Sequence, residues 1–561
     1  MFNPVGRRAM LAIAIVVSGA ACGDSVTEPE TPDTPAGLQV AQLTLTSVRI
    51  TWNSVTGVEG YRLERAAADD PGVFDQIGAG DLTDTTYDDT GLTAGVSYSY
   101  RVAAVAGGLT SDYTAAATIA TGVAAATLTG NITADRTLMA DSLYTLSGFV
   151  KVQNGATLTI EPGTRIVGDP STPGSSLWIL RGAKIEAVGT AAEPIVFTSA
   201  KPVGSRAPGD WGGLILIGRG RINRTGGPIN TEGPTPEDYS GGNDDADGSG
   251  TLRYVRVEFA GFDVSAGGGQ ELNSISAYAT GSGTRFEYVQ SMSGLDDSFE
   301  FWGGAAQGRY LISFESGDDH FDWSEGFRGK LQFIIGFQSQ RLVPAPGAGS
   351  FSSDPRGFEG DGCEPGLAGC TLTDNSASTP YSNPTIANFT LVGTGDLSGF
   401  PDDGRGMVLR RGTAGLLSNG VVARFKGVAC QMRDAWTDSL RLRDSLNLNN
   451  IIFADNTGGN YADPAANGSN DFCKAASWAG SNHIESAMAA AEIFTSLNAA
   501  SLDFTPASPG AVALGAGAIA LPAARAANFF GGTMATTTYA GAADPSAATP
   551  WWAGWSTYLI N

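Results

Sequence analysis

The sequence predicts an all-β chain in two parts, a small β-sandwich followed by a long stacked β-coil. Glycine is abundant, with 76 of the 561 residues, and charged residues make up only 16% of the chain. This composition suits a chain rich in turns and strands better than a helical one. Residues 36–122 contain short runs in which apolar and polar residues alternate, and the chain beyond them repeats itself. Alternation is typical of half-buried strands, and self-similarity is typical of a solenoid.

The first residues predict export. Residues 1–21 have the composition of a signal peptide, with Arg8 near the start and an apolar stretch, residues 10–17, that is too short to span a bilayer. Small residues precede Cys22, as in the cleavage motif of bacterial lipoproteins, although Gly19 stands where that motif usually has leucine. We expect a lipid anchor on Cys22 that holds the protein at the outer membrane or cell surface. Secretion without a lipid is the alternative.

The number of cysteines supports the same compartment. The chain has five, and a lipid on Cys22 would leave Cys363, Cys370, Cys430 and Cys473. Four cysteines can form two disulfides where the environment is oxidising. Cys363 and Cys370 bracket a short loop rich in glycine and are expected to pair, which would leave Cys430 for Cys473. A zinc site is the alternative, but no C-x-x-C pair or neighbouring histidine supports it.

A linker and a small domain follow the signal. Residues 22–35 are rich in proline, threonine and glutamate and predict a flexible, lipid-anchored tether. Residues 36–122 have the strand spacing of a β-sandwich. At Trp52, Tyr61 and residues 91–98 this segment resembles a fibronectin type III domain, because these positions match the core tryptophan, a strand tyrosine and the tyrosine corner of that family. The resemblance implies buried aromatic residues and a spacer or protein-contact module without catalysis.

Two internal echoes support the coil. The segment that begins at Asp296 is echoed 22 residues later at Asp318. Asn388, Asn419 and Asn450 follow one another at steps of 31 residues, and an apolar run comes after each of them. Periods of this size without paired helices predict a parallel β-helix. The asparagines should then stack in a ladder and form hydrogen bonds from coil to coil.

Residues 127–540 resemble the exported right-handed parallel β-helix proteins of bacteria. The matching segments are residues 155–164, 194–198 and 209–214. The resemblance implies the fold and the export of the chain, and it implies no particular activity.

The ends of a β-helix need caps, because open strand edges template aggregation. Residues 482–497 have apolar side chains near helical spacing and predict a helix. Residues 541–561, which include Trp551, Trp552 and Trp555, predict an aromatic C-terminal cap packed on the last coil. A platform on which glycans stack is the alternative for these tryptophans.

The first echo places aspartates on neighbouring coils. Asp296, Asp297, Asp318 and Asp319 should lie about 5 Å apart. Stacked carboxylates repel each other, so a cation, a proton or an arginine should offset them. Three interpretations remain open, namely carboxylates that cap turns, a Ca²⁺ site and a catalytic pair.

The catalytic interpretation rests on a resemblance. The segment from Gly317 to Asp319 is similar to the paired acids of pectin-degrading hydrolases, where they act as acid and base. His320 adds a titratable group, and Arg328 is the nearest arginine on the C-terminal side. Other motifs of that family are missing. The candidate catalytic residues are therefore the four aspartates of the ladder and Arg328.

The metal interpretation adds a second segment. Asn243, Asp245 and Asp247 place oxygen ligands at alternate positions and are followed by glycine, as in the first half of a Ca²⁺ loop. The glutamate expected at the twelfth position is missing, since Tyr254 stands there. Asp322 has the same 22-residue offset from Glu300 and completes the candidate metal ligands. A flexible acidic insertion is the alternative for the loop.

The net charge of −23 limits the partners. An acidic surface repels nucleic acid and anionic lipid and attracts cations, Ca²⁺ first among them. We therefore expect an adhesin-like binding or structural module that takes a cell-surface glycan or protein and reaches the membrane only through its lipid. A Ca²⁺-assisted polysaccharide lyase or glycoside hydrolase on the β-helix is the alternative.

Overall fold

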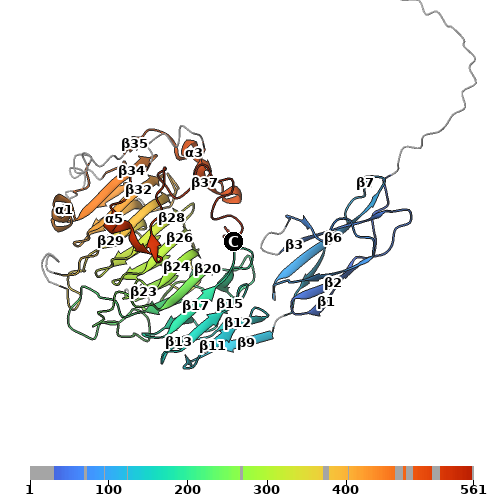
Figure 1. The fold of residues 1–561 in the computed structure, drawn as a ribbon, viewed down its shortest axis with the longest axis horizontal. Coiled ribbons are helices and arrows are strands. Elements are labelled where there is room, and N and C mark those ends of the chain that lie inside the picture. Colours follow the sequence, from blue (N-terminus) through green and yellow to red (C-terminus); the bar gives the residue numbers. More distant parts are fainter. Residues whose placement is uncertain are drawn as a thin grey trace, which may run out of the picture. The chain divides into compact units, whose positions relative to one another are not determined.

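The computed structural model describes residues 31–67, 72–93, 95–122, 124–265, 270–370, 378–401, 404–461, 472–474, 484–507 and 518–558. The signal peptide, Cys22 and His483 lie outside these ranges. Among the described residues, none of the helices is long and apolar enough to cross a membrane. The chain forms two compact units and passes from one to the other after Thr121 (Figure 1). Each unit is described by itself.

The first unit is the predicted antiparallel β-sandwich. One sheet has the strand order β1–β2–β5, and the other has the order β4–β3–β6–β7 with β8 beside β6. The strands are β1 (Gln39–Thr44), β2 (Ser47–Thr51), β3 (Gly60–Ala67), β4 (Asp75–Gln76), β5 (Thr86–Thr90), β6 (Ser97–Ala106), β7 (Leu109–Thr110) and β8 (Ala117–Ala120).

Aromatic residues fill the core of the sandwich, as predicted. Trp52 and Tyr61 are buried and meet edge to face, with ring centroids 5.4 Å apart. Tyr98 is buried in the same core. The hydroxyl group of the neighbouring core residue Tyr100 donates a hydrogen bond to Asp89 at 2.8 Å, which satisfies a polar group inside an apolar interior.

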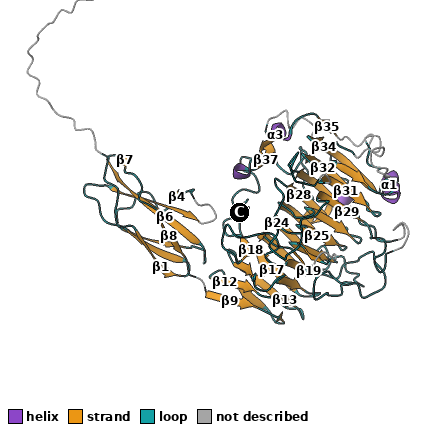
Figure 2. Cartoon of the chain, turned by 180° about the vertical axis from the view of Figure 1, so that it is seen from behind, coloured by secondary structure: helices purple, strands orange, loops and turns teal. Residues whose placement is uncertain are grey.

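The second unit is the predicted parallel β-helix, whose strands stack from β9 to β35 (Figures 1 and 2). Two long sheets run through its described residues, and all of their strand pairs are parallel. The ten-stranded sheet contains β10 (Asn131–Ile132), β13 (Phe149–Val152), β16 (Ser176–Ile179), β19 (Gly213–Ile217), β23 (Ile275–Tyr278), β25 (Phe299–Trp302), β27 (Phe321–Ser324), β29 (Arg356–Asp361), β31 (Arg405–Arg410) and β33 (Cys430–Met432).

The other long sheet of the described residues has fifteen strands and carries the remaining sides of the coils. They are β9 (Ala124–Leu128), β11 (Arg136–Leu138), β12 (Ser142–Leu146), β14 (Thr157–Ile160), β15 (Arg165–Gly168), β17 (Lys184–Val188), β18 (Ile195–Ser199), β20 (Gly250–Glu258), β24 (Arg285–Met292), β26 (Gln307–Phe314), β28 (Lys330–Phe337), β30 (Thr385–Val392), β32 (Gly415–Ala423), β34 (Leu446–Ala454) and β35 (Ile484–Ser486). Short hairpins join β21 (Phe262–Asp263) to β22 (Glu271–Leu272) and β36 (Phe494–Ser496) to β37 (Asp503–Pro506).

Equivalent residues of successive coils form columns inside the helix. In one column of the ten-stranded sheet, Ile275 pairs with Phe299, then Phe321, Phe358 and Met407 follow. All five are at most 1% exposed. The rings of Phe299 and Phe321 stack at 5.0 Å. Such columns explain the 22-residue echo, because each coil must present the same apolar residue to the same interior position.

A second column lies at a bend of the fifteen-stranded sheet, where the pairing of each strand with the next skips one residue. Its residues all have φ between 49° and 59°, a conformation that is rare outside glycine and asparagine. The predicted asparagines occupy it, and the Asn450 amide donates to Asn419 at 2.8 Å. Earlier coils place stacked rings there, with centroids 4.4 to 5.0 Å apart. The column consists of Tyr254, Tyr288, Tyr310, Phe333, Asn388, Asn419 and Asn450.

The helix expected over residues 482–497 is wrong for most of the part that the structure describes. The segment forms β35, the single turn α3 (Ala490–Ile493) and β36. Pairing with β34 at the end of the sheet satisfies the main chain of β35 and outweighs its helical spacing. The described residues also hold α1 (Ala435–Leu442), the turn η2 (Ala499–Ser501) and α5 (Ala523–Ala526), none of which was predicted.

Residues 518–558, here called the C-terminal strap, contain α5 and the hairpin of β38 (Ala527–Phe529) with β39 (Gly532–Thr533). Trp555 meets the rings of Tyr254 and Tyr288 edge to face at 5.9 Å, and Trp551 lies 5.2 Å from Tyr310. These rings belong to β20, β24 and β26, so the aromatic end of the strap covers a side of the helix and not the last coil. This corrects the predicted cap. Burial of Trp555 to 2% exposure also disfavours a glycan platform.

Both expected disulfides are present. Cys363 pairs with Cys370, and Cys430 pairs with Cys473. Cys430 continues the interior column after Met407, so the second bridge fastens a later segment to the end of the ten-stranded sheet.

Candidate functional site

An acidic cavity opens on the outer side of β25, β27 and β29 and has a volume of about 310 Å³. Of its lining in the described residues, twelve side chains are carboxylates, and the two cationic ones are Arg410 and Arg411. The carboxylates are Glu232, Glu271, Asp296, Asp297, Glu300, Asp318, Asp319, Asp322, Glu325, Glu359, Asp361 and Glu364. The cavity therefore contains the whole predicted aspartate ladder.

The register of the parallel strands determines which side chains line the cavity. Glu300, Asp322 and Glu359 occupy equivalent positions of three consecutive strands, so they form an outward column. Asp297 and Asp319 come from the turns just before two of these strands, and the Asp319 N–H donates to the Asp297 carboxylate at 2.8 Å. Parallel pairing brings equivalent side chains to within about 5 Å. The ladder thus follows directly from the repeat of the sequence.

Three groups of carboxylates lie close enough to share a cation. In each group one oxygen from every residue lies within 4.8 Å of the others. The groups are Asp296 with Asp297 and Asp318, Asp297 with Glu300 and Asp322, and Asp319 with Asp322 and Glu359. Asp297 and Asp322 each belong to two groups, so neighbouring sites would share a bridging carboxylate. Carboxylate oxygens are the ligands that Ca²⁺ prefers.

Burial makes these carboxylates hard to ionise. Asp319 is 1% exposed and Asp322 is 9% exposed. Burial, together with neighbouring acids, raises the pKa of Asp297, Asp319 and Asp322 well above the usual value. Burial raises the pKa of Asp318 to about 7, and burial with the neighbouring Asp361 raises that of Glu359 to about 8. Arg356 opposes the shift at Asp318, Asp319 and Glu359, and Arg410 opposes it at Asp322, but neither cancels it.

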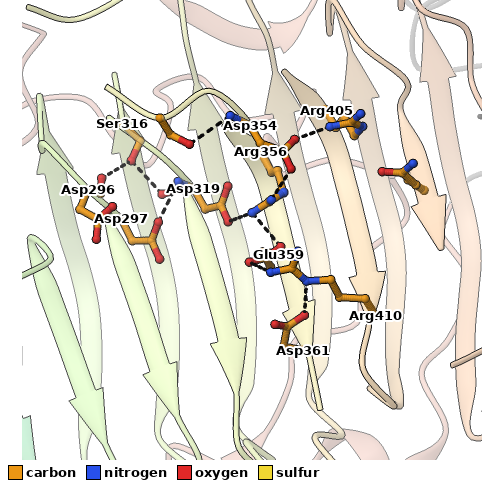
Figure 3. Close-up of polar contacts among 12 residues, drawn as sticks. Asp296, Asp297, Ser316, Asp319, Asp354, Arg356, Glu359, Asp361, Arg405 and Arg410 are labelled. Atoms are coloured by element: carbon orange, nitrogen blue, oxygen red, sulfur yellow. Dashed lines mark hydrogen bonds and ion pairs between the residues drawn. The ribbon is translucent and has the colours of Figure 1, made fainter. Parts of the chain in front are cut away.

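Arginines neutralise one end of the cavity (Figure 3). Arg356 contacts Asp319 at 3.0 Å and Glu359 at 2.7 Å. Arg410 contacts Glu359 at 2.7 Å and Asp361 at 2.8 Å. The opposite end, around Asp296, Asp297 and Glu300, has no such ion pair among the described residues. The two ends of the cavity therefore differ: the carboxylates at one end have arginine partners, and those at the other end have none among the described residues.

Some carboxylate oxygens lack any partner. In the part of the chain that the structure describes, Oδ1 of Asp318, of Asp319 and of Asp322 is buried and forms no hydrogen bond. A buried carboxylate oxygen without a partner costs free energy comparable to several lost hydrogen bonds. All three belong to the groups that could share a cation. A bound cation would supply the missing contacts.

Arg328 does not lie beside the aspartate ladder. It is not among the described residues that line the cavity, and its guanidinium donates to Asp245 at 3.0 Å. Arg356 and Arg410 take the expected place beside the ladder. Both arginines lie in coils that follow a long non-periodic loop, so the 22-residue repeat of the sequence does not extend to them. The signal that could have found Arg356 is Phe358-Glu359, a third copy of the pattern Phe321-Asp322.

The candidate calcium loop and Asp322 do not belong to one metal site. None of its ligands lines the acidic cavity in the described residues, and the exposed Asn243 stays at the surface. Asp245 accepts a hydrogen bond from the main chain of Arg221 at 3.0 Å, and Asp247 accepts one from Arg219 at 3.1 Å. These carboxylates stabilise the loop itself. Asp322 belongs to the ladder instead.

His320 is not a titrating group of the cavity. It is 3% exposed, and its Nδ1 lies 2.5 Å from the Ser313 hydroxyl group inside the helix. Burial lowers the pKa of His320 to about 3, so the ring stays neutral at physiological pH.

Comparison with known proteins places both units. The sequence model of the pectate-lyase-like beta helix domain matches residues 130–492, and that of the fibronectin type III domain matches residues 33–119. Exoglucanase B of Cellulomonas fimi is 37% identical over 93 residues, which are 16% of this chain and 8% of the relative. Chitinase 63 of Streptomyces plicatus is 36% identical over 92 residues, 16% of this chain and 14% of the relative.

Solved structures of fibronectin-like domains match as well. A Fn3-like protein from Clostridium thermocellum is 31% identical, with a TM-score of 0.15, over 16% of this chain and 92% of the other. The aligned lengths in the curated relatives are close to that of one fibronectin domain. This chain therefore spans only a small part of the relatives it matches.

Proposed function

The chain belongs to the pectate-lyase-like beta helix family and carries a fibronectin type III domain ahead of the helix, and from this premise we propose that it is an exported binding protein whose acidic cavity holds Ca²⁺. The architecture fits a binding or structural module. The observation that carries the proposal is the set of buried aspartate oxygens without partners inside the three carboxylate groups.

Calcium suits this cavity better than a transition metal. The described ligand groups contain only carboxylates, without histidine or thiolate. Hard oxygen ligands favour Ca²⁺, which accepts six to eight of them with flexible geometry. Shared carboxylates between neighbouring groups would hold two cations close together. Each cation would also offset the repulsion that raises the pKa values of the ladder.

An anionic glycan is the partner we propose for the loaded cavity. A cation held on one side by protein carboxylates has open positions for the carboxylate of an acidic sugar. Two of the curated relatives, which match over about the length of one fibronectin domain, are named as an exoglucanase and a chitinase, and these names support a glycan as the proposed partner of the chain. A cell-surface protein remains the second possible partner.

The localisation of the protein is part of the proposal. Two disulfides suit an oxidising compartment outside the cytoplasm. We propose that the chain is held at the outer membrane or cell surface by a lipid on Cys22. Membrane partitioning of a Cys22→Ser variant tests this, and unchanged partitioning would rule out the lipid.

Calorimetric titration of the full chain with Ca²⁺ tests the cavity. We expect Asp322→Asn to weaken binding at least about tenfold, because it removes a charged ligand from two groups at once. Asp245→Asn is the matched control, since it makes the same change in the candidate calcium loop, which lies outside the cavity. Loss of binding in Asp245→Asn with full binding in Asp322→Asn would move the site to the loop and overturn the proposal.

Catalysis by the same cavity is a second candidate. The observation that favours it is that Asp318, with its pKa raised to about 7, lines the cavity beside Asp319, whose ion-pair partner is Arg356. A carboxylate that titrates near neutral pH beside a guanidinium can act as acid or base in a lyase or hydrolase. Incubation with acidic polysaccharides, with and without Ca²⁺, tests this. Unsaturated or reducing products that disappear in Asp319→Asn would establish it.

A further inference from the structure

Amide side chains of the coil hold the main chain of the C-terminal strap. Gln332 accepts a hydrogen bond from the Ala535 N–H and donates one to the Ala535 carbonyl, both at 2.8 Å. Asn419 makes the same pair of bonds with Ile519, at 2.8 and 3.0 Å. Each amide satisfies both polar groups of a single strap residue, as the opposing residue does in an antiparallel sheet.

Two more glutamines lengthen this amide row. Gln290 accepts from the Thr557 N–H at 3.0 Å and donates to the Thr557 carbonyl. Gln307 donates to the Asn528 carbonyl at 2.7 Å and accepts from the N–H two residues later. All these contacts go to the main chain. They would form equally well with other side chains at these strap positions.

Buried side chains of the strap provide the selective contacts. Trp555 is 2% exposed and lies against the stacked rings of Tyr254 and Tyr288. Tyr558 donates to the buried Glu315 and lies 2.8 Å from the Ser339 hydroxyl group. Main-chain hydrogen bonds combined with pockets for a few side chains are the two components of peptide recognition by extended segments.

The strap depends on the coil for its conformation. Its own elements are α5, of four residues, and the hairpin of β38 and β39. Elements of this length are not stable alone in water. Its partners in the amide row lie between 100 and 267 residues away in the sequence. None of these contacts depends on which chain the strap comes from, because two copies offer the same face and the same strap.

We propose that this lateral face of the coil is a peptide-binding surface that binds the strap of its own chain and, after exchange, the strap of a second copy. Exchange of an identical element between copies needs no new contact, and this makes it a low-cost route to a dimer. The proposal does not rest on the acidic cavity, and Ca²⁺ has no part in it.

A cleavable chain tests the surface. A protease recognition sequence is placed in the full chain between residues 507 and 518, and the folded protein is cut. We expect the cut strap to copurify with the coil, and a fluorescent synthetic peptide of residues 518–558 to replace it, with the exchange followed by anisotropy. N-methylation of Ala535 in the peptide should weaken binding about tenfold, because it removes the hydrogen bond to Gln332. Ala535→Ser in the peptide should leave binding unchanged.

Variants of the coil complete the test. Gln332→Ala should weaken peptide binding by a similar factor. Asn447→Ala, which removes an amide that donates to the Asp444 carbonyl of a neighbouring turn, should have no effect. Two differently tagged full chains that are refolded together should copurify through exchanged straps. A cut strap that never exchanges with the peptide, or a peptide insensitive to N-methylation, would overturn the proposal. So would refolded chains that stay separate.

Discussion

Asp322 shows at the scale of one residue what the acidic cavity requires. Asp322 is 9% exposed, belongs to two carboxylate groups, and has one carboxylate oxygen without a hydrogen-bond partner in the described structure. An isolated buried carboxylate costs several kcal/mol. The folded chain at neutral pH therefore needs either a proton or a cation at this position.

The pH dependence of stability follows from these groups. We expect the free energy of unfolding in chelator to fall as the pH rises from about 4 to about 8. The pKa values of Asp318 and Glu359 are raised from 3.8 and 4.5 to about 7 and about 8. In this window the folded chain keeps protons that the unfolded chain releases, and each such proton contributes about 1.4 kcal/mol per pH unit to the fall. Urea unfolding at a series of pH values measures it.

Calcium should flatten this dependence, because a cation replaces the protons without leaving the carboxylates uncompensated. The matched measurement repeats the series in millimolar Ca²⁺. A free energy of unfolding that stays level in chelator would mean that the arginines already neutralise the ladder.

At the scale of elements, the cavity depends on how tightly one coil packs on the next. Gly317 lies in the turn between β26 and β27, directly before Asp318. A methyl group added to it would lie 1.4 Å from the main-chain oxygen of Leu295 in the preceding coil. Main-chain atoms cannot move aside as a flexible side chain can. The turn therefore accepts only glycine, and its tightness aligns the two coils that carry the ladder.

Gly317→Ala tests this packing. We expect it to lower the free energy of unfolding of the β-helix by more than about 2 kcal/mol, or to prevent folding, because the coils must separate. Gly532→Ala is the control, since its methyl group would meet nothing closer than 3.8 Å. Its effect should stay within about 0.5 kcal/mol. Equal effects of the two variants in urea unfolding would contradict the role of the turn.

Elements that repeat could be predicted from the sequence, and elements that depend on distant contacts could not. The steps between Asp296 and Asp318 and between the asparagines gave the coil, the ladder and the bend column, because equivalent positions must face equivalent surroundings. Arg356 was missed because a non-periodic loop precedes its coil. The aromatic cap of residues 541–561 was misplaced because the rings that Trp551 and Trp555 contact in the coil lie far away in the sequence, where no local pattern indicates them.

At the scale of the whole molecule, the two units have separate cores. In the sandwich the buried Asp89 carboxylate accepts hydrogen bonds from Arg65 at 2.9 Å and from Tyr100 at 2.8 Å. The apolar core of the β-helix is a different set of residues. Units with their own cores are expected to unfold separately.

Scanning calorimetry of the full chain should therefore show two transitions. Asp89→Ala should lower the free energy of unfolding of the sandwich by about 2–4 kcal/mol, because it leaves the buried Tyr100 hydroxyl group unpaired. Only the transition temperature of the sandwich should therefore fall. Asp88→Ala, which removes an exposed pair with Arg49, is the control and should leave both transitions nearly unchanged, because solvent screens the pair. Calcium should raise only the transition of the β-helix. A single transition that all three changes shift together would contradict separate unfolding.

Glu300, Asp322 and Glu359 occupy equivalent positions, so the main-chain positions of the acidic column are regularly spaced along the helix. Hydrogen bonds between neighbouring strands hold the main-chain positions of these residues about 4.8 Å apart, and side-chain motion does not change this main-chain spacing. Duplicating one coil, residues 296–317, would add one carboxylate to the acidic column and leave every neighbouring coil with a partner of the same shape. The cation capacity of such a chain would grow with its length, as the capacity of a linear polymer grows with its number of monomers.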